Sequence, residues 1–129
     1  MNTLEIVPTK SVCGVEFGNT RTAIEALFGK PAKTFKKSKW SKGETADYGN
    51  FHIYYDARGA FEAIEIFESE VRLPKGQISI PSSKDTVIEA LPSLKVDEYG
   101  LTSSNDSIGT SIEEGKVVSI LFGKPGYYA

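Results

Sequence analysis

Apolar side chains recur at helical spacing in two stretches of the chain. In the first stretch, Ile24, Leu27 and Phe28 fall at positions i, i+3 and i+4. A candidate N-cap at residues 19–20 precedes them, and a glycine and a proline within residues 29–31 follow them. These are the usual start and stop signals of a helix. The pattern therefore predicts a helix over about residues 20–28.

A second copy of this helical pattern lies half a chain further on. Five residue types of segment 22–27 recur in segment 86–91 at a constant offset of 64 positions. Ser82 or Ser83 can cap the second helix, and Asp85 lies near the positive end of its dipole. We therefore predict a helix over about residues 83–91 and interpret the chain as an internal duplication.

Alternation typical of strands follows the first helix. Residues 51–56 alternate apolar and polar side chains, residues 57–59 are interpreted as a turn, and residues 60–67 form the returning strand. In that strand Ile64 and Ile66 share one face, while Phe61, Glu65 and Phe67 share the other. A strand with apolar groups on both faces is central in its sheet, or it presents one face to a partner.

The second half repeats this order with loops of different length. Segment 117–121 echoes segment 63–67 at an offset of 54 positions, so that residues 108–112 and 116–122 form the corresponding hairpin. A short entry strand is expected at Leu4 and Ile6, with residues 12–17 as its continuation, and another at residues 77–80; residues 68–76 are interpreted as a connector. The expected fold class is α+β, with two helix-plus-antiparallel-sheet units in a single domain that spans residues 1–129. Repeat 1 covers about residues 12–68 and repeat 2 about residues 77–123.

Composition indicates an ordinary globular protein. Of the 129 residues, 40% are hydrophobic and 25% are charged, which excludes the disordered and fibrous classes. The single cysteine, Cys13, cannot form an internal disulfide, and this fits a reducing compartment. The first residues lack the pattern of a signal peptide, and no run reaches the ~18 apolar residues of a membrane span. We therefore expect a cytoplasmic protein that does not enter a membrane.

Charge is segregated along the sequence. Six lysines in residues 30–42 give this segment +6, whereas the whole chain carries −2, so the remainder sums to −8. The segment can be a solvated edge whose lysines discourage strand pairing. Alternatively it binds single-stranded nucleic acid, in which lysines contact phosphates and an aromatic ring stacks on a base. The residues of this alternative are Lys33, Lys36, Lys37, Lys39, Trp40 and Lys42.

The only histidine, His52, could serve as a general base in a small enzyme, with Asp56 and Tyr54 as its neighbours. No serine or cysteine nucleophile is linked to it by a recognisable motif, so a structural role is favoured. The chain contains neither a CxxC nor an HxxxH pattern. We therefore expect no metal site and no cofactor.

Tyrosine and tryptophan provide a second lead, because both residue types make rigid anchors at protein interfaces. Tyr54 is the best strand candidate, since it lies on the face opposite Phe51 and Ile53. Acidic neighbours would give such an interface its charge. The residues predicted to bind a partner are Trp40, Asp47, Tyr48, Tyr54, Asp56, Glu65, Tyr127 and Tyr128.

Several short motifs carry a resemblance to known families. They are Gly-x-x-Phe-Gly-x-Thr-Arg at residues 14–21, Leu-Phe-Gly-Lys-Pro at residues 27–31, and a tyrosine-rich hairpin that ends in Ile-Glu-Ile-Phe at residues 64–67. This plan resembles the tandem modules of beta-lactamase-inhibitor-like proteins and the module of small outer-membrane assembly lipoproteins. The resemblance implies one curved antiparallel sheet that carries two helices on one face and offers the other face to a protein.

The design is also similar to that of bacterial immunity proteins, which neutralise a toxin by covering its active site. Together these resemblances favour a non-catalytic protein-binding domain, an immunity or inhibitor protein whose partner is a toxin or another enzyme. Nucleic acid is the less favoured partner. The oligomeric state is left open.

Overall fold

The computed structural model describes residues 3–36, 39, 43–97 and 100–128. Within this part of the chain the fold is mostly β, with two helices and two sheets that consist largely of antiparallel strands. Neither of the two described helices has the length and apolar character needed to cross a membrane.

In the described part of the chain the larger sheet has nine strands, and its central pair is β7 (Phe61–Ile66) with β14 (Lys116–Gly123). On one side of this pair follow β6 (Phe51–Tyr55), β5 (Thr45–Asp47) and β4 (Lys33–Phe35). On the other side follow β13 (Ile108–Glu113), β12 (Gly100–Ser103) and β11 (Lys95–Asp97), and the short β10 (Ser82–Ser83) pairs with β14. The sequence pattern left two alternatives for strand 60–67, and the structure confirms that it is central in its sheet.

A smaller sheet was not expected from the sequence. It has the order β3 (Val15–Glu16), β2 (Ser11–Val12), β1 (Thr3–Val7), β8 (Ser69–Leu73) and β9 (Gly76–Ile80), and β1 runs parallel to β8. The interpretation of residues 68–76 as a connector was therefore wrong. Val71, Leu73, Ile78 and Ile80 alternate with polar residues and are buried, which is the pattern of a hairpin with one face on the core.

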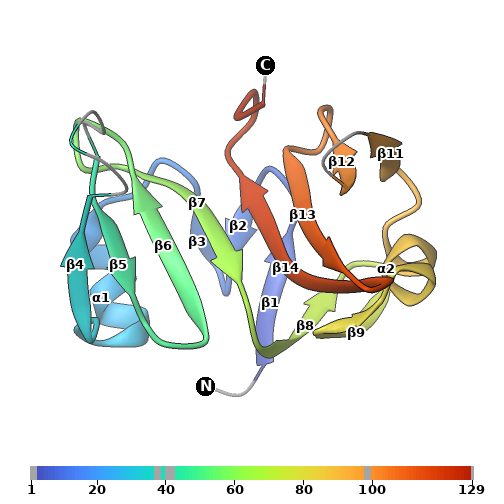
Figure 1. The fold of residues 1–129 in the computed structure, drawn as a ribbon. Coiled ribbons are helices and arrows are strands. Elements are labelled where there is room, and N and C mark those ends of the chain that lie inside the picture. The colour runs from blue at the N-terminus through green and yellow to red at the C-terminus, as the bar shows by residue number, and fades with distance from the viewer. Residues whose placement is uncertain (1–2, 37–38, 40–42, 98–99, 129) are drawn as a thin grey trace.

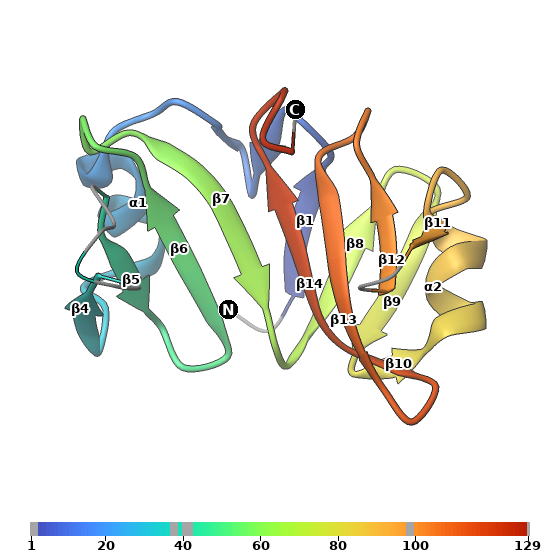
Figure 2. The same cartoon turned by 45° about the horizontal axis from the view of Figure 1, so that its top comes forward.

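The two helices begin within one residue of their predicted starts. In α1 (Arg21–Phe28) the side chain of Thr20 accepts a hydrogen bond from the Ala23 N–H, and in α2 (Lys84–Ala90) Ser83 accepts one from the Thr86 N–H. Both helices lie on one side of the larger sheet, with the smaller sheet between them (Figure 1, Figure 2).

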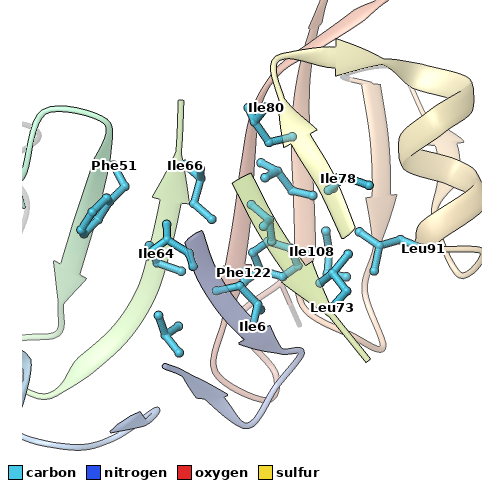
Figure 3. Packing of buried hydrophobic residues seen from close by; sticks show 14 of the residues in the cluster. Ile6, Phe51, Ile64, Ile66, Leu73, Ile78, Ile80, Leu91, Ile108 and Phe122 are labelled. Carbon is cyan, nitrogen blue, oxygen red and sulfur yellow. The ribbon is translucent and has the colours of Figure 1, made fainter. Parts of the chain in front are cut away.

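The hydrophobic core fills the space between the two sheets. Ile6 of β1, Ile64 and Ile66 of β7 and Phe122 of β14 are fully buried there (Figure 3). The helices cover the ends of the same core through Ile24 and Val87. Burying these side chains on one side leaves the opposite side of the larger sheet uncovered by either helix (Figure 1). We call this uncovered side the open face.

One side chain of β7 lies on the face opposite to the one predicted. The sequence alternation assigned Phe61 to the face of Glu65. The pairing of β6 with β7 shifts its register between Tyr54 and Tyr55, and this irregularity turns Phe61 into the core, where its ring stacks on Phe17 at 4.8 Å.

Candidate functional site

A single row of strand partners crosses the whole open face. Residues that stand opposite one another in paired strands point to the same side of the sheet, so the registers of the paired strands define the row without a break. From β4 to β11 its members are Lys33, Asp47, His52, Glu65, Leu121, Gly109, Thr102 and Lys95. Lysines therefore stand at both outer edges of the row, and two carboxylates stand inside it.

Aromatic rings gather around His52 in the first half of this face. The imidazole lies edge-on to Phe67, with ring centroids 4.8 Å apart, and contacts Phe35 at 5.7 Å and Tyr54 at 6.4 Å. Its Nε2 lies 3.5 Å from Oδ1 of Asp47. Phe35 remains 37% exposed, so this cluster presents an aromatic surface to solvent.

The residues after β14 fold back over the second half of the open face. The Lys124 N–H donates to the Glu62 carbonyl at 2.8 Å and holds the start of this tail. Beyond it, the rings of Tyr127 and Tyr128 pack edge to face, with centroids 5.2 Å apart. We call residues 124–128 the tyrosine tail.

Two strand glycines make room for the tyrosine tail. A Cβ atom at Gly123 of β14 would lie 2.6 Å from the Tyr127 ring, and one at Gly109 of β13 would lie 2.2 Å from the Tyr128 phenol oxygen. Both distances are shorter than van der Waals contact. The absence of a side chain at these two positions is therefore what allows the tail to lie against the sheet.

Glu65 lies at the centre of the open face and accepts hydrogen bonds from two hydroxyl groups. Tyr54 donates to its Oε1, and Ser119 of β14 donates to its Oε2 at 3.2 Å. Tyr54 is buried, and it packs with Ala63, Leu121 and Tyr127 rather than with the main core. It therefore belongs to the floor of the open face and is not an exposed anchor.

The phenols around Glu65 are held in their neutral form. Burial, followed by the hydrogen bond to Glu65, raises the pKa of Tyr54 far above its usual value. Burial and then the neighbouring Tyr127 and Glu65 raise the pKa of Tyr128 to about 12. The raised pKa values keep both phenols protonated well above neutral pH.

A cavity of about 390 Å³ opens between Glu65 and the tyrosine tail. Hydroxyl groups of β12, β13, β14 and an adjoining loop form much of its wall. Glu65 is the only charged residue among the described residues that line it. The lining residues are Glu65, Thr102, Ser104, Gly109, Thr110, Ser111, Ser119, Leu121 and Tyr128.

The open face brings together five of the eight residues predicted to bind a partner. These five are Asp47, Tyr54, Glu65, Tyr127 and Tyr128. The first three come from the consecutive strands β5, β6 and β7, and the sheet registers place them on one side. Tyr127 and Tyr128 come from the tail at the other end of the chain, which packs on the same side.

Two of the other predicted residues, Tyr48 and Asp56, lie away from the open face, and Trp40 lies outside the described residues. Tyr48 stacks on Phe51 at 5.1 Å and donates its O–H to the Gly29 carbonyl, so it packs beside α1. Asp56 accepts hydrogen bonds from the Arg58 and Ala60 N–H groups. The pKa of the Asp56 carboxyl is lowered, mainly by the hydrogen bond from the Ala60 N–H. This side chain therefore serves to form the turn after β6.

The alternative sites are only partly assembled. Lys33, Lys36 and Lys39 are exposed, whereas Lys37, Trp40 and Lys42 lie outside the described residues. The enzyme hypothesis needed His52, Tyr54 and Asp56 in one place. The carboxylate beside His52 is Asp47 and not Asp56, which is held in its turn at the other end of β6.

Sequence reasoning placed Phe67 on the face of Glu65 without including it among the partner-binding residues, and it missed Phe35, Gly109 and Ser119 as residues of this face. For Phe67 a signal existed, because it is apolar on the same side as Glu65. For Gly109 there was none, since its importance comes from the tail residue that lies above it. Ser119 gains its role only because the register of β7 with β14 brings it to Glu65.

Within the described ranges, no three histidine, cysteine or acidic side chains gather closely enough to hold a metal ion. No protein-family model matches the chain, and comparisons with curated proteins and with solved structures give no match either.

Proposed function

We propose that this protein is a non-catalytic protein-binding domain that uses the open face of its larger sheet. The observation that carries the proposal is the placement of its exposed aromatic side chains. Phe35 is 37% exposed and Tyr128 is 41% exposed, and both lie on the open face. The aromatic rings around His52 lie between the edge strand β4 and Glu65. Exposed aromatic groups on one uncovered face are typical of a recognition surface.

The charge of the face favours a partner with a basic surface. The carboxylates of Asp47 and Glu65 lie inside the strand row, and the chain outside residues 30–42 sums to −8. Complementary potentials speed encounter and fix the orientation of two proteins. We therefore propose a cationic partner surface for the centre of the face.

The proposed mode of action is occlusion. An immunity or inhibitor protein of this kind covers the active site of a toxin or another enzyme, and a few aromatic anchors supply most of the affinity. A cytoplasmic location is part of the proposal, and the single cysteine of the chain supports it.

An internal duplication is the architectural part of the proposal. It is supported by the order of elements, since α1 precedes β4 to β7 and α2 precedes β11 to β14. It is also supported by the capping residues Thr20 and Ser83, which make the same hydrogen bond to the third residue after them. On this proposal the halves differ in function, because aromatic rings surround His52 in one half of the open face, whereas hydroxyl groups beneath the tyrosine tail form the other half.

Affinity capture with matched variants tests the proposed function. The folded protein is used as bait in a lysate of its source cell, beside the double variant Phe35→Ala/Tyr128→Ala. We expect one protein to be retained in stoichiometric amount by the wild type. The double variant should weaken retention by at least about 2 kcal/mol, the size expected for an interface hot spot.

Val96→Ala is the matched control, because Val96 is 80% exposed and its strand partner Leu101 is part of the core, so that both lie on the other side of the sheet. This variant should retain the partner as well as the wild type does. Equal retention by the wild type and the double variant would refute the use of the open face.

A single-stranded nucleic-acid binder is the second candidate, and one observation favours it. The exposed Lys33 and Lys36 flank the exposed ring of Phe35 on the edge strand β4, an arrangement that suits phosphate contacts beside a stacked base. This candidate predicts that retention on single-stranded DNA falls steeply between about 50 and 200 mM salt. No retention at low salt would exclude it.

A further inference from the structure

We infer that the cavity beside Glu65 is a receptor for the guanidinium group of an arginine side chain presented by the bound protein. The source of that arginine rests on the proposed function. The chemistry of the cavity does not, because it can be tested with a small arginine compound alone.

Glu65 has acceptor capacity that its present contacts do not use. A carboxylate offers about four lone-pair positions, and those of Glu65 receive one hydroxyl from Tyr54 and one from Ser119. Among the described residues, no lysine or arginine forms an ion pair with it. Lys124, which begins the tyrosine tail, pairs with Glu62 instead. A half-buried carboxylate of this kind favours a cationic ligand.

The walls of the cavity suit a planar cation better than a compact one. The ring of Tyr128 forms one wall, and an arginine side chain stacks on aromatic faces. Hydroxyls of Thr102, Ser111 and Ser119 line the remaining walls and can accept the outer N–H groups of a guanidinium. The fork of N–H donors matches the two oxygens of Glu65, whereas an ammonium group offers no such planar pair.

The cavity is large enough and is accessible. Its volume of about 390 Å³ falls within the ~300–1,000 Å³ of ordinary ligand pockets. Ser104 and Ser111 at its rim are exposed to solvent, so a side chain can enter from outside without unfolding a strand.

NMR titration of the full chain with N-acetyl-arginine methylamide tests the inference. The amide signals of Gly109, Ser111, Ser119 and Leu121 report on the cavity. We expect saturable shifts confined to these residues and their neighbours, with a dissociation constant on the order of 1–10 mM for so small a ligand. The uncharged citrulline analogue should cause no such shifts, and the lysine analogue should bind more weakly.

Two variants remove the site by different routes. Glu65→Gln should weaken binding about ten-fold or more, because it replaces a charged acceptor by a neutral one. Ser111→Lys changes an exposed strand residue and places an ammonium group at the rim, where it pairs with Glu65 and blocks entry. Glu113→Gln is the control. It removes one carboxylate charge, as Glu65→Gln does, but at an exposed position of β13 outside the cavity, so it should leave binding unchanged.

The inference is overturned if the citrulline or lysine analogue shifts the same signals as strongly as arginine does. Binding of wild-type strength in the single variant Glu65→Gln and also in the single variant Ser111→Lys would overturn the inference as well. Failure of the proposed function looks different. Arginine would then bind in the cavity, while no protein would be retained in a manner that depends on Phe35 and Tyr128.

Discussion

The phenol oxygen of Tyr128 lies so close above Gly109 that a Cβ atom added there would be 2.2 Å away from it. Gly109 is third from the edge of its half of the strand row, counting from Lys95, and His52 is third from the other edge, counting from Lys33. In the half of the sheet that contains β4, the imidazole of His52 thus occupies the third position of the row. In the half that contains β11, Gly109 has no side chain at this position, and the ring of Tyr128 occupies the space.

This relationship predicts the effect of Gly109→Ala. The added methyl group should displace Tyr128 from the sheet while the core stays intact, because the tail can move away. Overpacking in a rigid core costs about 1–3 kcal/mol, and we expect a loss near 1 kcal/mol here. Spectrophotometric titration should show the pKa of Tyr128 falling from about 12 toward that of an exposed tyrosine.

Gly76→Ala is the control for this experiment. A Cβ atom at Gly76 would have no heavy atom within 4 Å, so the change should leave both the tyrosine titration and the free energy of unfolding nearly as they were. An unchanged tyrosine titration in Gly109→Ala would contradict the seating of Tyr128 on β13.

Alkaline pH should destabilise the protein through the tyrosines of the open face. The folded state raises the pKa of Tyr128 from 10.0 to about 12, so it binds this proton more tightly than the unfolded chain does. The resulting stability is complete below about pH 10 and is lost as the pH rises toward 12. Urea unfolding at several pH values should show this decline, and Tyr128→Phe should make it shallower. An equal decline in the variant would argue against the assignment to Tyr128.

Tyr54 and Glu65 should stabilise the fold as a coupled pair. Hydrogen bonds to charged groups contribute about 1.5–3 kcal/mol, and we expect a coupling energy near the lower end, because Glu65 keeps its bond from Ser119. A double-mutant cycle with Tyr54→Phe and Glu65→Gln measures it.

Tyr48→Phe provides the comparison for this cycle, since the Tyr48 hydroxyl donates to the Gly29 carbonyl on the other side of the sheet. Combined with Glu65→Gln, it should give additive effects. Additivity in the Tyr54 cycle as well would show that the hydrogen bond to Glu65 contributes no stability.

The core and the exposed strand edge should respond very differently to truncation. Ile66 is fully buried between the two sheets, so Ile66→Ala should cost about 2–5 kcal/mol in the free energy of unfolding. Val96→Ala should change it by less than about 0.5 kcal/mol, because Val96 is 80% exposed. Chemical denaturation of both variants checks this, and similar losses would place the core elsewhere.

Local sequence signals were enough to find the helices and the central strands. Thr20 and Ser83 cap helices where the pattern placed the caps, because capping depends on residues within one turn of each other. Alternation likewise put Tyr54 on the side opposite Phe51 and Ile53, since that property depends only on the period of a strand.

Features that depend on pairing between distant segments were not found. The parallel pairing of β1 with β8 links residues 3–5 to residues 70–72, and nothing near either segment specifies the other. The irregular pairing that turns Phe61 into the core is likewise a property of two strands together. The site was found only in part for the same reason, since Ser119 meets Glu65 across the central strand pair and Gly109 matters only beneath Tyr128.

Hydroxyl-radical footprinting of the complex recovered from a lysate tests the central claim most directly, because it reports which face the partner covers. Oxidation of Phe35, Phe67 and Tyr128 should fall several-fold in the complex relative to the protein alone. Oxidation of Val96 should stay the same. Protection of Val96 with an unprotected open face, or a lysate from which the protein retains no partner, would contradict the account.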